Sequence, residues 1–379
     1  MSNSSASQGS PSPSRRARVL IADDSVVARG LFNRWISEHP SMLVVAVTVD
    51  GLSAVKAAAR HQPDLVVLDL DMPVMDGLTA LPEILKVSPQ SHVLIASSLT
   101  ARSARLSMQC LALGAIDIQP KPESNRDLTM SLSFRQELLH KLEGLIGANP
   151  RAARGARPEL ASTAGRQHDP SAGGASARPR RPDVVPRALV IGASTGGPRA
   201  VSQVLSDLGC ACDKVPVFVI QHMPPLFTTS FAEQLQHRLN RSVREAADGD
   251  IPVAGTVFVA PGGRHLRLEK TDGQVRMRLD DSAPVKFCRP SIDMFFADAA
   301  TSYGASAMAV ILTGMGTDGV DGARLLKKSG SVIIAQDEAT SVVWGMPGAI
   351  SREGLADHVL PVSEIGALIR SSFPTGDPR

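Results

Sequence analysis

The 379-residue chain contains few aromatic residues and few cysteines. Phenylalanine, tryptophan and tyrosine make up 3% of it, so a set of aromatic side chains for stacking on nucleic-acid bases is not expected. The four cysteines form neither a disulfide framework nor a two-pair zinc motif. Cys210 and Cys212 lie close enough to touch one metal ion, but no nearby histidine completes a site. All four cysteines are therefore interpreted as reduced thiols of a cytoplasmic protein.

The chain also lacks a strong net charge and a long apolar run. Its 40 basic and 37 acidic residues give +3, a field too weak to indicate a polyanionic partner such as nucleic acid. No apolar run approaches the roughly 20 residues that a membrane-spanning helix needs. The Ser- and Pro-rich segment Met1–Ser14 has no apolar signal-peptide core. We expect a cytoplasmic protein without membrane insertion, with a disordered tail over residues 1–16.

The length favours two domains separated by a segment of low complexity. Residues 150–186 are dominated by Ala, Gly, Pro, Ser and Arg and contain few large apolar residues. Such a segment cannot bury enough surface to offset its ordering entropy. We predict a flexible linker over residues 148–186, between one domain at 17–147 and a second at 187–379. Its arginines are either solvated, which is favoured, or docked on an acidic surface.

The first region alternates apolar runs with stretches of helical spacing. The predicted strands are Arg18–Ala22, Met42–Val47, Asp64–Leu68, His92–Ala96 and Ala115–Ile118, and the predicted helices include Val27–Ser37 and Ala54–Arg60. Near-continuous apolar strands alternating with helices indicate an α/β fold with a doubly wound parallel sheet. Ligands of such sheets bind beyond the carboxyl ends of the strands.

Several polar residues stand at those strand ends. Asp23, Asp24 and Asp69 would repel one another unless a cation compensates them, and their hard oxygen ligands suit Mg²⁺. Lys121 could pair with a carboxylate or with an anion placed on it, and Ser97 could donate its hydroxyl to the same anion. An acidic pair at a strand end is otherwise commonly a helix N-cap, a role open to Asp24.

The segments Val19–Ser25 and Asp64–Gly77, together with Ser97 and Lys121–Pro122, resemble the receiver domain of two-component response regulators. This resemblance implies a flavodoxin-like fold in which Asp69 accepts phosphate from a partner histidine kinase. The other implied roles are Mg²⁺ ligation by Asp24 and Asp69 through carboxylates, by Asp71 through its carbonyl and by Asp23 through water, and contacts to the phosphoryl group by Ser97 and Lys121. Ile118 stands where many receivers carry a Tyr or Phe switch residue, so a ring flip is not available here.

The second region again alternates apolar runs with helical stretches. Its predicted strands are Leu189–Gly192, Val215–Ile220, Thr256–Ala260, Ala307–Leu312 and Val332–Ala335, which predict a second doubly wound α/β domain. Ser194, His222 and Asp318 each follow such a run, which is the placement that a nucleophile, its base and an orienting acid require. Ser194 taken alone is a nucleophile, a phosphate binder or simply a helix N-cap. Gly192–Gly196 matches the nucleophile elbow of α/β-hydrolases, but the order Ser, His, Asp differs from their order Ser, acid, His.

Six ordered segments of this region resemble the chemotaxis protein-glutamate methylesterase family, CheB. They are Ile191–Pro198, Gln221–Pro224, Ala260–His265, Arg289–Asp293, Leu312–Gly319 and Val343–Pro347. The resemblance implies Ser194 as nucleophile, His222 as general base, Asp318 as orienter and the backbone N–H of Met315 in the oxyanion hole. It implies no cofactor in the esterase site.

The implied activity is hydrolysis of glutamate γ-methyl esters, with deamidation of glutamine, on chemoreceptors at receptor arrays. We expect the unphosphorylated receiver to pack over the esterase cleft and phosphorylation of Asp69 to release it. A non-enzymatic, phospho-regulated adaptor is the alternative hypothesis. A DNA-binding response regulator is a third, but the second region shows no helix-turn-helix pattern.

Overall fold

The computed structural model describes residues 15–121, 128–148 and 184–373. Nearly all of the predicted N-terminal tail and most of the predicted linker lie outside these residues. In the part of the chain that is described, no helix combines the length and the hydropathy needed to cross a bilayer.

The described residues up to 148 form an N-terminal domain built on a five-stranded sheet of order β2-β1-β3-β4-β5 in which all pairs are parallel. Its strands are β1 (Ala17–Ala22), β2 (Met42–Thr48), β3 (Leu65–Asp69), β4 (His92–Ser97) and β5 (Asp117–Pro120). This strand order is that of flavodoxin-like sheets, which confirms the predicted fold class. The fifth strand lies two residues later than predicted.

Helices cover both faces of this sheet. They are α1 (Val26–Ser37), α2 (Gly51–His61), α3 (Gly77–Val87), α4 (Ala101–Leu113) and α5 (Leu128–Ala148). Side chains of α1 and α5 pack on one face, and those of α2, α3 and α4 pack on the other. The first four helices begin at side-chain caps, because Ser25, Asp50, Asp76 and Thr100 each accept a hydrogen bond from the backbone N–H three residues later. The cap of α1 is thus Ser25, so the N-cap interpretation of Asp24 is wrong.

The described residues from 184 to 373 form a C-terminal domain with a second parallel sheet of order β14-β13-β12-β6-β7-β9-β8. Its strands are β6 (Ala188–Ala193), β7 (Val217–Gln221), β8 (Ser242–Glu245), β9 (Thr256–Val259), β12 (Ala307–Ile311), β13 (Val332–Gln336) and β14 (His358–Leu360). The first strand of the domain, β6, is central, and the chain winds outward from it in both directions. The prediction of a second doubly wound domain is confirmed.

Helices again form two layers around this sheet. They are α7 (Gly197–Leu208), α8 (Phe227–Leu239), α9 (Ile292–Tyr303), α10 (Val320–Ser329), α11 (Met346–Arg352) and α12 (Val362–Ser371). The helices α7, α8 and α12 pack on one face, and α9, α10 and α11 pack on the other. An antiparallel hairpin of β10 (His265–Thr271) and β11 (Gln274–Asp280) lies beside α9 and was not predicted from the sequence.

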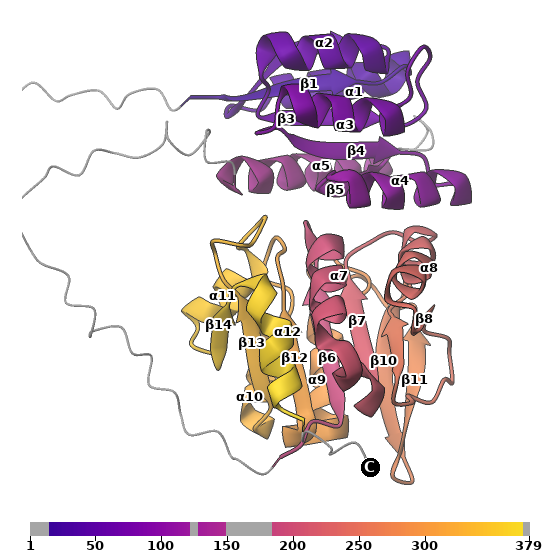
Figure 1. Cartoon of the computed structure of the whole chain (residues 1–379), viewed down its shortest axis with the longest axis vertical. Helices are drawn as coiled ribbons and strands as arrows, with labels where there is room; N and C mark the ends of the chain where they lie inside the picture. Colours follow the sequence, from indigo (N-terminus) through magenta and orange to yellow (C-terminus); the bar gives the residue numbers. More distant parts are fainter. Residues whose placement is uncertain (1–14, 122–127, 149–183, 374–379) are drawn as a thin grey trace, which may run out of the picture.

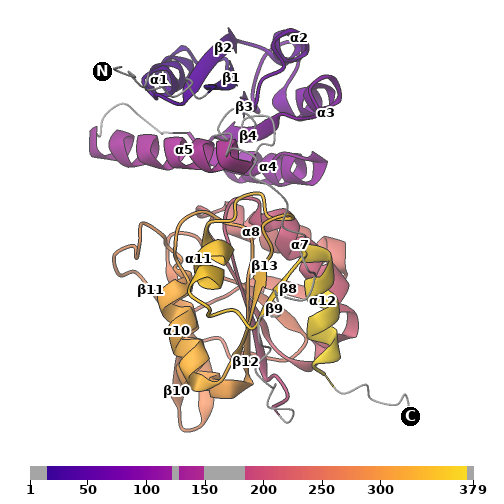
Figure 2. The same ribbon diagram turned by 90° about the vertical axis from the view of Figure 1, so that its left-hand side faces the viewer.

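The two domains lie against each other. Helix α4 packs against α7 and α8, and α5 lies beside α4 on the same face of the N-terminal domain, toward the C-terminal domain (Figures 1 and 2). One apolar core runs from α4 into α7 and α8. The Gln234 side-chain amide donates to the Met108 carbonyl over 2.9 Å, and the Thr195 hydroxyl donates to a carboxylate oxygen of Asp117 over 2.9 Å. Thr195 and Asp117 are both buried, so a polar contact inside this interface links β5 to the turn that follows β6.

Candidate active site

The carboxyl end of the second sheet has a switch point between β6 and β12. The chain leaves β6 toward β7 on one side and returns later to β12 on the other side. In open α/β sheets this arrangement opens a crevice beyond the strand ends, where ligands bind. Ser194 directly follows β6, and the segment Thr313–Asp318 follows β12. The sequence-predicted residues therefore gather at the position that the topology favours.

Ser194 is held by backbone contacts to both neighbouring strands. Its N–H donates to the Thr313 carbonyl over 3.1 Å, and its carbonyl accepts from the Gln221 side chain at 2.9 Å. The N-cap of α7 is Gly196, with φ of 77° and no side-chain cap bond, so the N-cap interpretation of Ser194 is wrong. A Cβ at Gly314 would lie 2.7 Å from the Cβ of Ser194, and glycine there lets the two loops meet.

His222 and Asp318 form a direct pair. Nε2 of His222 lies 2.9 Å from Oδ2 of Asp318. The buried carboxylate also accepts hydrogen bonds from Ser291 Oγ at 2.9 Å and from the backbone N–H groups of Ile292 and Asp293, at the start of α9. Burial alone would raise the pKa of Asp318, but the hydrogen bonds from His222 and from these amides lower it to about 2. Asp318 is thus a fixed anion that orients the imidazole.

The other imidazole nitrogen, Nδ1, faces Cys288. The Sγ of Cys288 lies 3.5 Å from Nδ1. Burial alone would lower the pKa of His222, but the charge of Cys288 and the bond to Asp318 outweigh it and raise this pKa to about 10. In the described part of the chain, no hydrogen bond joins Ser194 to His222. They follow Ala193 and Gln221, which are paired across β6 and β7, so the nucleophile and the imidazole occupy neighbouring strand ends.

Met315 lies in the loop after β12. Among the described residues none accepts a hydrogen bond from its backbone N–H, while the preceding Gly314 N–H donates to the Val343 carbonyl over 3.0 Å. The Met315 side chain packs on α5 of the N-terminal domain, in an apolar cluster with Leu142 and Val343. The residue expected to stabilise an oxyanion is therefore also a contact between the domains.

The sequence-predicted acidic site is assembled at the carboxyl end of the first sheet. Carboxylate oxygens of Asp23, Asp24 and Asp69 all lie within 4.8 Å of one another. Nζ of Lys121 lies 2.8 Å from Asp23 and 2.7 Å from Asp69. The buried hydroxyl of Ser97 has no hydrogen-bond partner among the described residues. Three hard oxygen donors fit Mg²⁺, and a free hydroxyl beside an ammonium group fits a phosphoryl group.

The two remaining features of this site are Asp71 and Gly77. Asp71 is exposed, and its N–H lies 3.4 Å from Oδ1 of Asp69. Its carbonyl, the predicted ligand, has no contact that tests the prediction. A Cβ at Gly77 would lie 2.0 Å from the Asp69 carbonyl, so only glycine lets α3 begin this close to Asp69.

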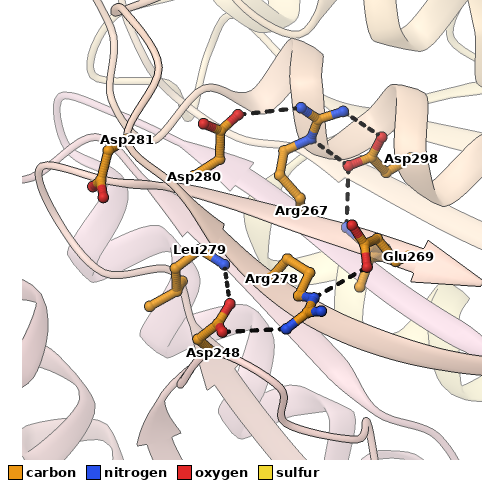
Figure 3. Close-up of a pocket in the computed structure, with 9 residues that line it drawn as sticks. Asp248, Arg267, Glu269, Arg278, Leu279, Asp280, Asp281 and Asp298 are labelled. Carbon is orange, nitrogen blue, oxygen red and sulfur yellow. Dashed lines mark hydrogen bonds and ion pairs between the residues drawn. The ribbon is translucent and has the colours of Figure 1, made fainter.

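A hollow of about 440 Å³ lies over the β10–β11 hairpin, away from these residues (Figure 3). Arg267 makes two bonds to Asp298 at 2.6 and 2.9 Å, and Arg278 lies 3.0 Å from Glu269 and 3.3 Å from Asp248. The lining contains no serine, cysteine or histidine. Arg267 fastens the hairpin to α9, and Arg278 is matched by carboxylates of β10 and of the loop before β9, so the hollow is interpreted as a structural ion-pair network.

Comparison with known proteins identifies both domains. The family "CheB methylesterase" matches residues 189–369, and "Response regulator receiver domain" matches residues 19–133. A protein-glutamate methylesterase/protein-glutamine glutaminase of Rhodopseudomonas palustris strain BisB5 is 44% identical over 95% of this chain and 94% of its own length. The chain belongs to the CheB methylesterase family.

A second relative is similar over nearly the whole chain, and a solved structure is similar over half of it. A group 2 operon methylesterase/glutaminase of Bradyrhizobium diazoefficiens is 40% identical over 94% of each chain. The crystal structure of the Thermotoga maritima CheB methylesterase catalytic domain shows 41% identity, covers 50% of this chain and 99% of that one, and has a TM-score of 0.48. In this chain the receiver and methylesterase families match consecutive parts of one polypeptide.

The contact between Cys288 and His222 was not predicted from the sequence. The four cysteines were interpreted as reduced thiols without a site, and Cys288 stands 66 positions from His222 in the chain. A single cysteine outside any spacing motif gives no signal that it will meet a histidine. The turn of residues 285–288, just before Arg289–Asp293, places Cys288 next to the imidazole of His222.

Proposed function

We propose that this protein hydrolyses glutamate γ-methyl esters, and deamidates glutamine, on the cytoplasmic helices of chemoreceptors under the control of receiver phosphorylation. The observation that carries the proposal is the His222–Asp318 pair, with Nε2 and Oδ2 2.9 Å apart beside Ser194. A carboxylate that already accepts four hydrogen bonds besides that of His222 holds the imidazole in one tautomer. The names of its full-length relatives supply the substrate class.

In the first half of the reaction, Ser194 Oγ attacks the ester carbonyl carbon. The proton of the hydroxyl passes to Nδ1 of His222, because Nε2 donates to Asp318. The carbonyl oxygen becomes an oxyanion that backbone N–H groups stabilise, and the unbonded N–H of Met315 is the donor we assign. Removal of one such donor costs about 10²–10³-fold in rate in serine hydrolases.

Collapse of this intermediate breaks the bond to the methoxy oxygen. His222 returns its proton to that oxygen, and methanol leaves an acyl-serine. Water then attacks the acyl carbon and gives a proton to His222, which passes it to Ser194 Oγ as glutamate is released. With a glutamine substrate the leaving group is an amine, which must be protonated by His222 and departs as ammonia.

Regulation is proposed to act through the interface between the domains. Asp69 would accept the phosphoryl group, with Lys121 and Ser97 on its oxygens. Mg²⁺ would be held by Asp23, Asp24, Asp69 and Asp71 and would neutralise the negative charge gathered there. In the arrangement described above, α5 covers Met315 and Asp117 accepts from Thr195, next to Ser194. These contacts between the domains support an autoinhibited resting form. Phosphorylation would separate α5 from Met315.

The deciding experiment is methanol release from methylated chemoreceptor membranes, with and without a small-molecule phosphodonor and Mg²⁺. Release should rise with phosphodonor. In Ser194→Ala it should fall to background, by a factor on the order of 10⁶ for a lost serine nucleophile. Ser206→Ala is the matched control, because the Ser206 hydroxyl only bonds Ser202 within α7.

Two outcomes would contradict the proposal. No methanol from folded protein under either condition would mean another substrate or a purely non-enzymatic adaptor. Release that is equal with and without phosphodonor, and unchanged in Asp69→Asn, would refute the regulatory part.

A further inference from the structure

The nitrogen of His222 that receives the serine proton lies beside a thiol. Sγ of Cys288 is 3.5 Å from Nδ1. Zinc binds thiolate sulfur at about 2.3 Å and imidazole nitrogen at about 2.0–2.1 Å, so two such ligands at a tetrahedral angle are about 3.5 Å apart. The observed spacing, which also suits a hydrogen bond between the two groups, therefore matches the edge that one zinc ion would need.

The imidazole is prepared for a metal by its partner on the other side. Ligating histidines usually donate their second ring N–H to a carboxylate, which fixes the tautomer and raises the basicity of the ligand. Nε2 of His222 makes this bond to Asp318, which leaves Nδ1, the ring nitrogen that faces Cys288, as the position where zinc would replace a proton. Asp318 itself is excluded as a ligand, since both of its oxygens are occupied by Ser291 and by backbone amides.

Cys288 is held in place by a tight turn. The backbone N–H of Val285 donates to the Cys288 carbonyl over 3.1 Å, and the Cys288 N–H donates back over 2.8 Å. Within this turn, the ammonium group of Lys286 is drawn away from the thiol by Asp293 and Asp321, each at 2.7 Å. The backbone of Cys288 is therefore fixed, and its Sγ also lies 3.5 Å from the Lys286 carbonyl oxygen.

The other cysteines do not offer such a site. Cys110 and Cys212 are buried, and burial raises their pKa values to about 12 and about 11. Cys210 is exposed and belongs to no group of three candidate metal ligands among the described residues. Soft thiolate and imidazole ligands select zinc over magnesium, so the site would not respond to the Mg²⁺ that the receiver requires.

We propose that Cys288 and His222 form an inhibitory zinc site that reversibly switches off the esterase. The inference rests on the proposed function for its effect on turnover. Zinc binds Nδ1 of His222 and the sulfur of Cys288. The one proton that these two residues share is released to solvent, and water completes the coordination. His222 then cannot accept the proton of Ser194, so the esterase stops without any change in the receiver.

The test uses the full-length protein with Mg²⁺ and phosphodonor present. Added Zn²⁺ should inhibit methanol release, EDTA added in excess over zinc should restore it, and extra Mg²⁺ should not inhibit. In Cys288→Ala, compared with its own zinc-free rate, half-inhibition should need at least about tenfold more zinc, the least that loss of a ligand should cost. Cys210→Ala is the matched control and should remain as sensitive as the wild type.

A second readout is independent of catalysis. Co²⁺ in place of Zn²⁺ should give a thiolate-to-cobalt charge-transfer band in the wild type and in Cys210→Ala, and no such band in Cys288→Ala. Absence of the band in the wild type, or equal zinc inhibition in Cys288→Ala, would overturn the proposal. If the protein shows the band but hydrolyses no receptor ester, the metal site stands and the proposed function fails.

Discussion

Replacing Gly144 by leucine is expected to activate the unphosphorylated enzyme. Gly144 lies on α5, where the N-terminal domain covers the loop that carries Met315. A Cβ at this position would lie 2.9 Å from Cε and 3.3 Å from Sδ of Met315, and 3.4 Å from a methyl group of Val343. Alanine would require only the flexible end of Met315 to move. The larger side chain of leucine must displace Val343 as well.

The size of the effect follows from the cost of overpacking. Extra methylene groups in a packed interface cost about 1–3 kcal/mol, which corresponds to a shift of about 5–150-fold in the equilibrium between the closed and open arrangements. The clash exists only while the domains are docked. Within α5 itself, leucine is more favourable than glycine by roughly 0.8–1 kcal/mol, so the receiver should remain folded.

The assay is methanol release without phosphodonor, with the phosphorylated wild-type rate as the upper limit. Gly147→Leu is the matched control: it makes the same change on the same helix, and nothing described lies within 4 Å of its added Cβ. Basal release should rise in Gly144→Leu and stay unchanged in Gly147→Leu. An equal rise in both variants, or no rise in a folded Gly144→Leu protein, would refute the reasoning that docking inhibits.

Two further predictions concern His222 and Phe287. The pKa of His222 is raised from 6.5 to about 10; because imidazolium cannot accept the Ser194 proton, turnover in zinc-free buffer should rise with pH through a midpoint above 6.5. The stabilisation gained from protonated His222 is complete below pH 6.5 and is lost as the pH rises through about 10. Cys288→Ala should lower the turnover midpoint, and a wild-type midpoint at or below 6.5 would contradict this account. Phe287 is 97% exposed with φ of 65°, a left-handed conformation that costs about 1–2 kcal/mol. Glycine itself costs about 0.5–1 kcal/mol in conformational entropy on folding. Phe287→Gly should therefore raise the unfolding temperature by an amount equivalent to about 1 kcal/mol or less. A lower unfolding temperature in thermal unfolding experiments would contradict this prediction.

The sequence predicted the buried strands well because apolar residues are nearly continuous in them. Val190, Val219 and Val310 stand in such runs, and all three are buried in parallel strands. The β10–β11 hairpin was missed because its strands are rich in charged residues, such as Arg267 and Arg278. These pair with carboxylates of the hairpin and its neighbours, so no apolar pattern marks them.

The candidate site was largely predictable because its residues follow apolar runs. The N-cap alternatives for Asp24 and Ser194 could not be rejected from local sequence, since the choice depends on whether the next residues complete the helix start. Contacts between the domains were also beyond reach. Thr195 and Gly144 carry no pattern of their own, and their roles arise only from the residues placed opposite them.

The buried bond between Thr195 and Asp117 joins the two domains. Binding at the esterase should therefore affect the receiver, just as phosphorylation of the receiver should affect the esterase. If phosphorylation favours the open arrangement, then anything that binds only the open arrangement must favour phosphorylation by the same factor, because coupling free energies are reciprocal. Under the proposed function, a receptor segment that lies over Ser194 would bind only the open arrangement. The substrate would thus hold the receiver in its signalling state, and a receptor rich in methyl groups would prolong the signal that removes them.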